Sequence, residues 1–351
     1  MPVTGETLTP LNPKVHVSSI GQSQSKAEVS TWQQELASAV RTPEDLCSRL
    51  GLSIESVSSK ASETFPVVVT ESFLKRMEVG NPRDPLLLQV LPVAEEEQSA
   101  TGFVSDPTGD LQAQSTEGLL RKYTGRALLV LTGTCAIHCR YCFRREFPYD
   151  LAPKSLAAWE LAFEEIAADE TLSEVILSGG DPLVWNDHKL QQLVDRIEQI
   201  PHVQRLRIHS RIPIVLPNRI TEELIQTLHN TRLQVVMVIH SNHRNELQGD
   251  CLDQITRLQQ QGIPLLNQAV LLRGINDSVE ALVDLCEHCA NFGVMPYYLH
   301  QLDRVSGASH FEVPMEEGKQ LVDELRKRLP GYAVPRYVQE VPGALSKQPI
   351  E

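Results

Sequence analysis

Short apolar runs alternate with amphipathic stretches along the chain after residue 120. Six runs have the composition of buried strands: 127–131, 174–177, 205–209, 234–239, 264–271 and 294–299. Between them lie segments with helical spacing of apolar positions, at 156–167, 188–200, 221–230, 249–261 and 279–292. This alternation predicts an α/β fold with a parallel sheet and right-handed crossovers. Because six units are fewer than the eight of a complete barrel, we expect a partial (β/α)6 TIM-like barrel.

The chain before this alternation has a different pattern. Residues 1–28 are rich in Pro, Ser, Thr and Gln without an apolar period, which predicts a flexible lead-in. Residues 29–120 are predicted to form an N-terminal helical segment, in which Thr42 caps a helix that begins at Pro43. The barrel core is expected to span 121–330, and residues 331–351 to form a separate C-terminal segment.

Three cysteines follow the first predicted strand: Cys135, Cys139 and Cys142. The C-x3-C-x2-C spacing can bind three irons of a [4Fe–4S] cluster. The fourth iron would then lack a protein ligand, which indicates a cluster that binds a small molecule and acts on it. A structural zinc site usually combines paired cysteines or histidines, and no well-spaced second pair follows closely. The motif also lies where a parallel α/β fold carries its site, in a loop after a strand.

Composition defines the setting of this motif. The 351 residues contain 41% hydrophobic residues and carry a formal net charge of −13. An acidic surface repels phosphate backbones, so we expect no nucleic-acid partner. Seven cysteines without a disulfide framework fit a reducing compartment. Because neither a signal-peptide pattern nor a membrane-spanning apolar run is found, we expect a cytoplasmic protein without membrane contact.

A second motif directly follows the second predicted strand: Ser178, Gly179, Gly180, Asp181 and Pro182. Taken alone it could be a simple strand-to-helix turn, but paired glycines also allow close approach to a ligand. With the three cysteines and Tyr141, the motif resembles the radical S-adenosylmethionine superfamily. The resemblance implies a [4Fe–4S] cluster that binds S-adenosylmethionine. It places Tyr141 near the adenine, residues 178–181 near the methionine amino group, and His240 near the same cofactor.

Further runs resemble the lysine 2,3-aminomutase family between about Asn81 and Lys347. They include Gly80-Asn81-Pro82-Arg83-Asp84-Pro85, Cys142-Phe143-Arg144-Arg145, Ser210-Arg211-Ile212-Pro213 and Pro342-Gly343-Ala344-Leu345-Ser346-Lys347. The resemblance implies an isomerase that converts (S)-α-lysine to (R)-β-lysine by a radical 1,2-amino shift. It also implies pyridoxal 5′-phosphate, bound covalently by Lys347.

The same resemblance assigns roles to single positions. Arg144 would pair with the substrate carboxylate, because its geometry suits bidentate contact. Asp303 and Glu340 would hold the distal ammonium group of lysine. Arg126 and Gln268 would lie around the pyridoxal phosphate.

The chain departs from the family pattern at several places. Glu340 stands where Asp is usual, His300 stands where Tyr is usual, and Gly-Ala-Leu-Ser replaces a run of glycines. The zinc-binding C-terminal extension of the catabolic aminomutases has no match in this sequence. We interpret Cys286 and Cys289 as packing residues within a helix. The short form resembles the bacterial aminomutases of elongation factor P modification, in which a ligase attaches the β-lysine to the factor.

The resemblance further implies free lysine as substrate, an electron donor of the flavodoxin or ferredoxin type, and a homo-oligomer. Two other functions stay open: a related aminomutase acting on glutamate, and a non-catalytic iron–sulfur electron carrier. The acids at 303 and 340 disfavour an acidic substrate because like charges repel. An electron carrier would need neither the Gly-Gly-Asp motif nor Lys347.

Overall fold

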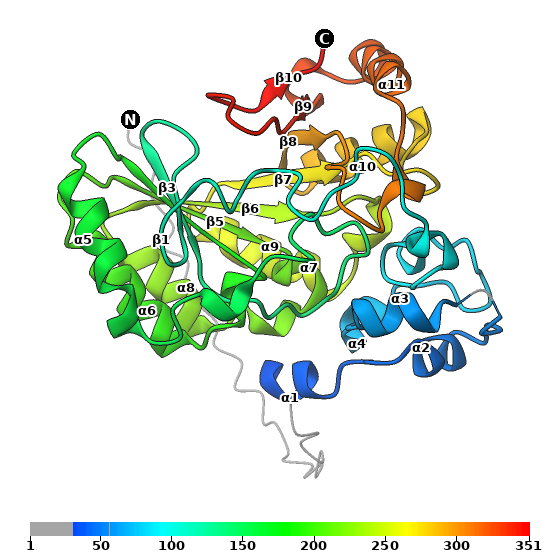
Figure 1. Ribbon diagram of the computed structural model, residues 1–351, viewed down its shortest axis with the longest axis horizontal. Helices are drawn as coiled ribbons and strands as arrows, with labels where there is room; N and C mark the ends of the chain where they lie inside the picture. Colours follow the sequence, from blue (N-terminus) through cyan, green and yellow to red (C-terminus); the bar gives the residue numbers. More distant parts are fainter. Residues whose placement is uncertain (1–30, 56) are drawn as a thin grey trace, which may run out of the picture. The chain divides into compact units, whose positions relative to one another are not determined.

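Ten strands pair in chain order, from β1 to β10, in one sheet (Figure 1). The computed structural model describes residues 31–55 and 57–351, so the predicted lead-in lies outside the described residues. Seven strands run parallel: β3 (Arg126–Val130), β4 (Glu174–Ser178), β5 (Arg205–Ser210), β6 (Gln234–His240), β7 (Leu265–Val270), β8 (Met295–His300) and β9 (Arg336–Gln339). Short antiparallel strands border them: β1 (Gln114–Thr116), β2 (Leu119–Leu120) and β10 (Gln348–Pro349).

Helices alternate with the parallel strands. They are α5 (Glu160–Ala168), α6 (Asp187–Glu198), α8 (Glu222–Asn230), α9 (Asp250–Gln260), α10 (Val279–Asn291) and α11 (Met315–Arg328), with a short α7 (Ile212–Val215) after β5. Figure 1 shows α5, α6 and α8 together on one side of the strands. In α6 the buried residues Leu190, Leu193, Val194 and Ile197 follow the i, i+3, i+4, i+7 spacing of an amphipathic helix.

The predicted α/β fold with a mostly parallel sheet is confirmed. All six predicted strands and all five predicted helices are present, although residues 156–159 form a 3-10 turn before α5. The seventh parallel strand, β9, and the helix that precedes it, α11, were not predicted. Within the described residues, β1 and β10 end the strand order without pairing to each other, so the sheet is an open one.

Among the described residues of the N-terminal segment, 31–55 and 57–120, four short α-helices form, and this agrees with the predicted helical character. These are α1 (Trp32–Ala37), α2 (Pro43–Arg49), α3 (Ser59–Thr64) and α4 (Glu71–Leu74). The Thr42 side chain accepts a hydrogen bond from the Asp45 backbone N–H, and Pro43 occupies the first turn of α2, which confirms the predicted cap. Leu46 and Phe73 are fully buried in the same apolar cluster as the barrel strands. The strands β1 and β2, which end this segment, were not predicted. The division into four parts stays a prediction.

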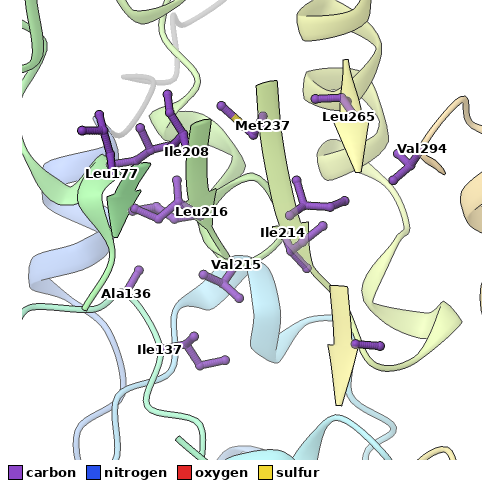
Figure 2. Packing of buried hydrophobic residues seen from close by; sticks show 14 of the residues in the cluster. Ala136, Ile137, Leu177, Ile208, Ile214, Val215, Leu216, Met237, Leu265 and Val294 are labelled. Carbon is purple, nitrogen blue, oxygen red and sulfur yellow. The ribbon is translucent and has the colours of Figure 1, made fainter. Parts of the chain in front are cut away.

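The apolar core extends from the strands to the cysteine loop. Figure 2 shows Leu177 of β4, Ile208 of β5 and Met237 of β6 in this core, with Ala136 and Ile137 near them. Ala136 and Ile137 lie between the first two cysteines of the motif and are almost completely buried. Their burial anchors the loop that carries the thiols, because apolar surface removed from water resists re-exposure. Among the described helices none is long and apolar enough to span a lipid bilayer.

Candidate active site

A cavity of about 670 Å³ opens at the carboxyl ends of the parallel strands. This end of a parallel α/β sheet is where loops form ligand sites. All of the site residues predicted from the sequence line it: Cys135, Cys139, Cys142, Tyr141, Arg144, Arg126, Ser178, Gly179, Gly180, Asp181, His240, Gln268, Asp303, Glu340 and Lys347. The structure therefore brings together residues that are up to 221 positions apart, between Arg126 and Lys347.

The three cysteine thiols share one electrostatic environment. Burial, together with the neighbouring thiol of Cys139, raises the pKa of Cys142 to about 11. Burial also raises the pKa of Cys135, with Cys142 and Cys139 adding to the effect. Arg211 places a guanidinium nitrogen 2.7 Å from the Cys139 sulfur. The raised pKa values mean that the thiolate forms require a nearby positive charge, and the Arg211 guanidinium provides one beside Cys139.

The paired glycines contact the cysteine loop. The Gly180 N–H donates to the Thr132 carbonyl at 2.6 Å, and the Asp181 N–H donates to the Thr134 carbonyl at 2.9 Å. A Cβ atom at Gly180 would stand 2.5 Å from the Thr134 carbonyl oxygen, and one at Gly179 would stand 2.7 Å from the Thr132 carbonyl oxygen. The glycines therefore permit one loop backbone to lie against another.

Asp181 connects two loops of the cavity wall. Its carboxylate accepts hydrogen bonds from the Ser210 hydroxyl at 2.8 Å and from the backbone N–H groups of Arg211 at 2.8 Å and Leu183 at 3.0 Å. Burial raises its pKa to about 6, and these hydrogen bonds oppose that rise. Both carboxylate oxygens are already engaged by protein donors. Asp181 thus positions the loops after β4 and β5, a role that the sequence did not indicate.

Tyr141 is fixed by a buried polar network. Its hydroxyl accepts from Asn242 Nδ2 at 2.6 Å and from Arg211 Nη1 at 2.9 Å, and lies 3.2 Å from His240 Nε2. Burial lowers the pKa of His240 to about 3, so the imidazole is neutral. Arg211 pairs in turn with buried Glu246 at 2.8 Å. A satisfied network of this kind holds the aromatic ring in one orientation at the cavity wall.

Arg144 is held by contacts on two sides. Its Nε donates to Asp110 Oδ2 at 2.5 Å, and its Nη1 donates to the Ser178 hydroxyl at 3.0 Å. Asp110 also pairs with Lys122 at 2.5 Å. Arg144 and Lys122 hold the pKa of Asp110 well below its usual range, although burial acts in the opposite direction. A cationic site with a fixed orientation results.

The carboxylates of Glu340 and Asp303 are influenced by the ammonium group of Lys347. Its ammonium donates to Glu340 at 2.5 Å, and the Tyr123 hydroxyl donates to the other oxygen of Glu340 at 2.5 Å. Burial raises the pKa of Glu340, but Lys347 and Tyr123 lower it more, so its pKa lies below the usual value. Burial raises the pKa of Asp303 to about 7, with Lys347 opposing the rise and Glu340 adding to it.

Comparison with known proteins shows the family of this chain. Residues 129–286 match the Radical SAM superfamily. The chain is 45% identical to L-lysine 2,3-aminomutase of Escherichia coli (strain K12), over 91% of this chain and 94% of that protein. It is 42% identical to L-lysine 2,3-aminomutase of Haemophilus influenzae, over 91% of this chain and 95% of that protein. The chain belongs to the L-lysine 2,3-aminomutase family. It is also 33% identical to the L-lysine 2,3-aminomutase of Clostridium subterminale, of which it covers 79%.

Family membership implies an isomerase with a [4Fe–4S] cluster and S-adenosylmethionine, and the donor set fits the cluster. Cys135, Cys139 and Cys142 line one cavity. Within residues 31–55 and 57–351, no three Cys, His, Asp or Glu side chains converge on a point where one metal ion could bind. The three thiolates lie on one loop, and each could bind a separate iron of a cube.

The sequence analysis also predicts bound pyridoxal phosphate, and the residues in this cavity are chemically suited to it. Lys347 offers a primary amine on the cavity wall. Arg126 stacks over the Tyr123 ring with its guanidinium carbon 5.1 Å from the ring centroid, and Arg207 lines the same cavity. A guanidinium is a good partner for a phosphate. Gln268 reaches the cavity from β7.

Several charged residues of the site were missed by the sequence analysis. Asp110 and Lys122 lie in loops near β1 and β2, in positions to which no motif gave a role. Arg211 belongs to a run that carries the family resemblance, yet its contact with Cys139 could not be inferred from that run. In the sequence these residues are charged positions next to apolar stretches. Such a pattern usually indicates a solvated surface, so it does not identify a residue of a binding site.

Proposed function

We propose that this protein is a lysine 2,3-aminomutase that converts (S)-α-lysine to (R)-β-lysine by a radical 1,2-amino shift. The proposal rests chiefly on one observation: the three thiols of the radical SAM motif and Lys347 line the same cavity. When bound, the cluster and S-adenosylmethionine would supply the radical, and pyridoxal phosphate on Lys347 would supply the group that carries the migrating amine. The remaining residues of the cavity bind and orient the substrate.

The charges of the cavity match the two ends of lysine. Among the described residues, only Asp110 and Ser178 accept hydrogen bonds from the Arg144 side chain, which leaves N–H groups for the α-carboxylate. A guanidinium can bind a carboxylate through two hydrogen bonds. Asp303 and Glu340 offer carboxylates to the distal ammonium group. Fixing both ends restrains the carbon atoms between them, which matters because an unrestrained radical would react elsewhere.

Glutamate is a poorer fit for the same cavity. Its distal carboxylate would lie near the carboxylates of Asp303 and Glu340, and like charges repel strongly where water is scarce. A purely electron-transferring protein is also disfavoured, since it would have no use for the paired Lys347 and Glu340 inside the cavity that contains the cluster motif.

We also propose roles for the remaining cofactor and substrate contacts. Tyr141 would lie near the adenine of S-adenosylmethionine, and His240 near the same cofactor. Residues 178–181, which include Asp181, would lie near its methionine amino group. Arg126 and Gln268 would contact the pyridoxal phosphate. The fixed ring of Tyr141 supports this arrangement.

The relatives and the free cysteines support a proposal for the pathway and the compartment in which the enzyme works. The chain is 45% identical to the Escherichia coli relative and 33% identical to the Clostridium relative, so it is more similar to the former. We propose that its β-lysine supplies a ligase that modifies elongation factor P, in the cytoplasm, with a flavodoxin- or ferredoxin-type electron donor and a homo-oligomeric enzyme. The cysteines are all free, which supports a reducing compartment. Mass spectrometry of elongation factor P from cells with and without this gene tests that assignment.

The activity itself can be tested directly. Anaerobically reconstituted, reduced protein is incubated with S-adenosylmethionine, pyridoxal phosphate and either lysine or glutamate, and the α- and β-amino acids are separated by chiral chromatography. We expect β-lysine from lysine and no β-glutamate. The variants Cys135→Ala and Lys347→Ala should form neither product. Turnover of glutamate without turnover of lysine would contradict the proposal.

A further inference from the structure

Asp110 is a buried carboxylate in the cavity wall to which the family resemblance gave no role. It is 1% exposed and lies in the loop before β1. The loop holds it in place, because its backbone N–H donates to Asp106 Oδ1 at 2.9 Å and the Thr108 hydroxyl donates to its Oδ1 at 3.0 Å. A carboxylate is seldom buried without partners, and here its two charged partners, Arg144 and Lys122, are cations that line the cavity.

The contact with Arg144 uses one particular edge of the guanidinium. Asp110 Oδ2 accepts from Nε at 2.5 Å, and Ser178 accepts from Nη1 at 3.0 Å. Of the five N–H bonds of an arginine, three are then left, all on the Nη1 and Nη2 nitrogens. The side of the guanidinium that carries Nε is therefore taken by Asp110. Both N–H groups of Nη2 and one of Nη1 remain for a carboxylate that arrives in the cavity.

The second cation extends this arrangement to the far end of the site. Lys122 is 2.5 Å from Asp110 Oδ1 and 3.6 Å from Glu340 Oε1. Glu340 in turn accepts from Lys347 at 2.5 Å. A continuous series of opposite charges thus joins Arg144, proposed for the carboxylate of lysine, to Glu340, proposed for its ammonium group.

We infer that Asp110 is a positioning residue for substrate binding, which fixes Arg144 through Nε so that the Nη1–Nη2 edge faces the substrate carboxylate. Lys122 supports it by neutralising the second oxygen of Asp110 and by linking it to Glu340. The inference rests on the proposed function, because it assigns a carboxylate substrate to Arg144. A merely structural Asp110 would order its loop without affecting how Arg144 binds a ligand.

The first test compares Asp110→Asn with the parent as reconstituted holoenzyme. An amide of the same size loses the charge that aligns the guanidinium, so the KM for lysine should rise about tenfold to a hundredfold, with a smaller change in kcat. Binding of lysinamide, which lacks the carboxylate charge, should change less than twofold. Asp187→Asn is the matched control: Asp187 pairs with buried Arg219 at 2.7 Å but does not line the cavity, so its KM should stay at the parental value.

The second test asks whether Asp110 acts through Arg144. Lysine binding is measured by equilibrium dialysis in the parent, in Asp110→Asn, in Arg144→Gln and in the double variant, so that no turnover is needed. In the Arg144→Gln background, Asp110→Asn should weaken binding less than twofold, because coupled residues are not additive. Lys122→Met, which keeps the carboxylate, should weaken binding in the same direction and also lose its effect in that background.

The outcomes separate the two proposals. If the parent does not turn over lysine, the proposed function fails. If the parent does so, but Asp110→Asn and Lys122→Met lower only the melting temperature, or weaken lysine and lysinamide equally, the inference about Asp110 is wrong. Fully additive losses in the double variant would overturn it as well.

Discussion

Replacement of Gly180 by alanine tests whether the Gly-Gly motif supports the cysteine loop. The added methyl carbon would stand 2.5 Å from the carbonyl oxygen of Thr134, the residue before Cys135. Ordinary contact distances are about 3.5 Å, so the two loops would have to separate by about 1 Å. Relief is hindered by the hydrogen bonds that join the loops, from the Gly180 and Asp181 N–H groups. Overpacking of this kind costs about 1–3 kcal/mol.

The assay has two readouts. We expect Gly180→Ala to lower the melting temperature of the metal-free protein by a few degrees, and to lower the iron and sulfide bound per chain after anaerobic reconstitution. Gly331→Ala is the control, because no atom lies within 4 Å of its added Cβ and its φ is not positive. It should change stability by less than about 0.5 kcal/mol. If Gly180→Ala had a lower melting temperature but bound as much iron as the parent, the claim that the Gly-Gly motif supports the cysteine loop would be refuted.

Further predictions concern the rest of the cavity. Burial raises the pKa of Asp303 to about 7, so the fraction of its carboxylate form increases as the pH rises through 7. The KM for lysine, measured from initial rates, should therefore fall over that interval. Asp303→Asn should remove this pH dependence of the KM. Lys347→Ala should abolish the absorbance of protein-bound pyridoxal phosphate after gel filtration, and an unchanged spectrum would rule out Lys347 as the attachment site. Cys286→Ser and Cys289→Ser should leave the iron content unchanged and destabilise the fold by about 1–3 kcal/mol, measured by urea unfolding, because both thiols are buried in α10. A loss of iron in either variant would contradict their assignment as packing residues.

The parts of the fold that were predicted share a strong local signal. Most of the six predicted strands are rich in apolar residues that the sheet buries, as in β6, where four of seven residues are buried. The strand β9 lacks this signal, since only Tyr337 and Val338 are buried among its four residues. It is defined by pairing with β8, a contact between distant parts of the chain. Helix α11 is strongly charged, and only Leu321, Val322 and Leu325 with Gly318 face inward.

The site shows the same division between local and distant information. The cysteines, the glycines and Lys347 were found because each occurs in a short recognisable run. Asp110 was not found, because its partner Arg144 lies 34 residues away along the chain. Arg211 and Cys139 are 72 residues apart. No local pattern encodes such pairs, which form only when loops of different strands meet at the carboxyl end of the sheet.

The balance of charge in the cavity indicates which acid is left for a substrate. Asp110 pairs with Arg144 and Lys122, and Glu340 accepts from Lys347 and Tyr123. Among the described residues, no side chain forms a hydrogen bond or ion pair with the Asp303 carboxylate, and its pKa of about 7 reflects burial without a bound cation. An ammonium group placed beside Asp303 would lower that pKa and complete the balance. A second carboxylate in the same place would raise it further, because two like charges would then share one buried pocket. The same property of Asp303 therefore favours a substrate with a distal ammonium group and disfavours one with a distal carboxylate.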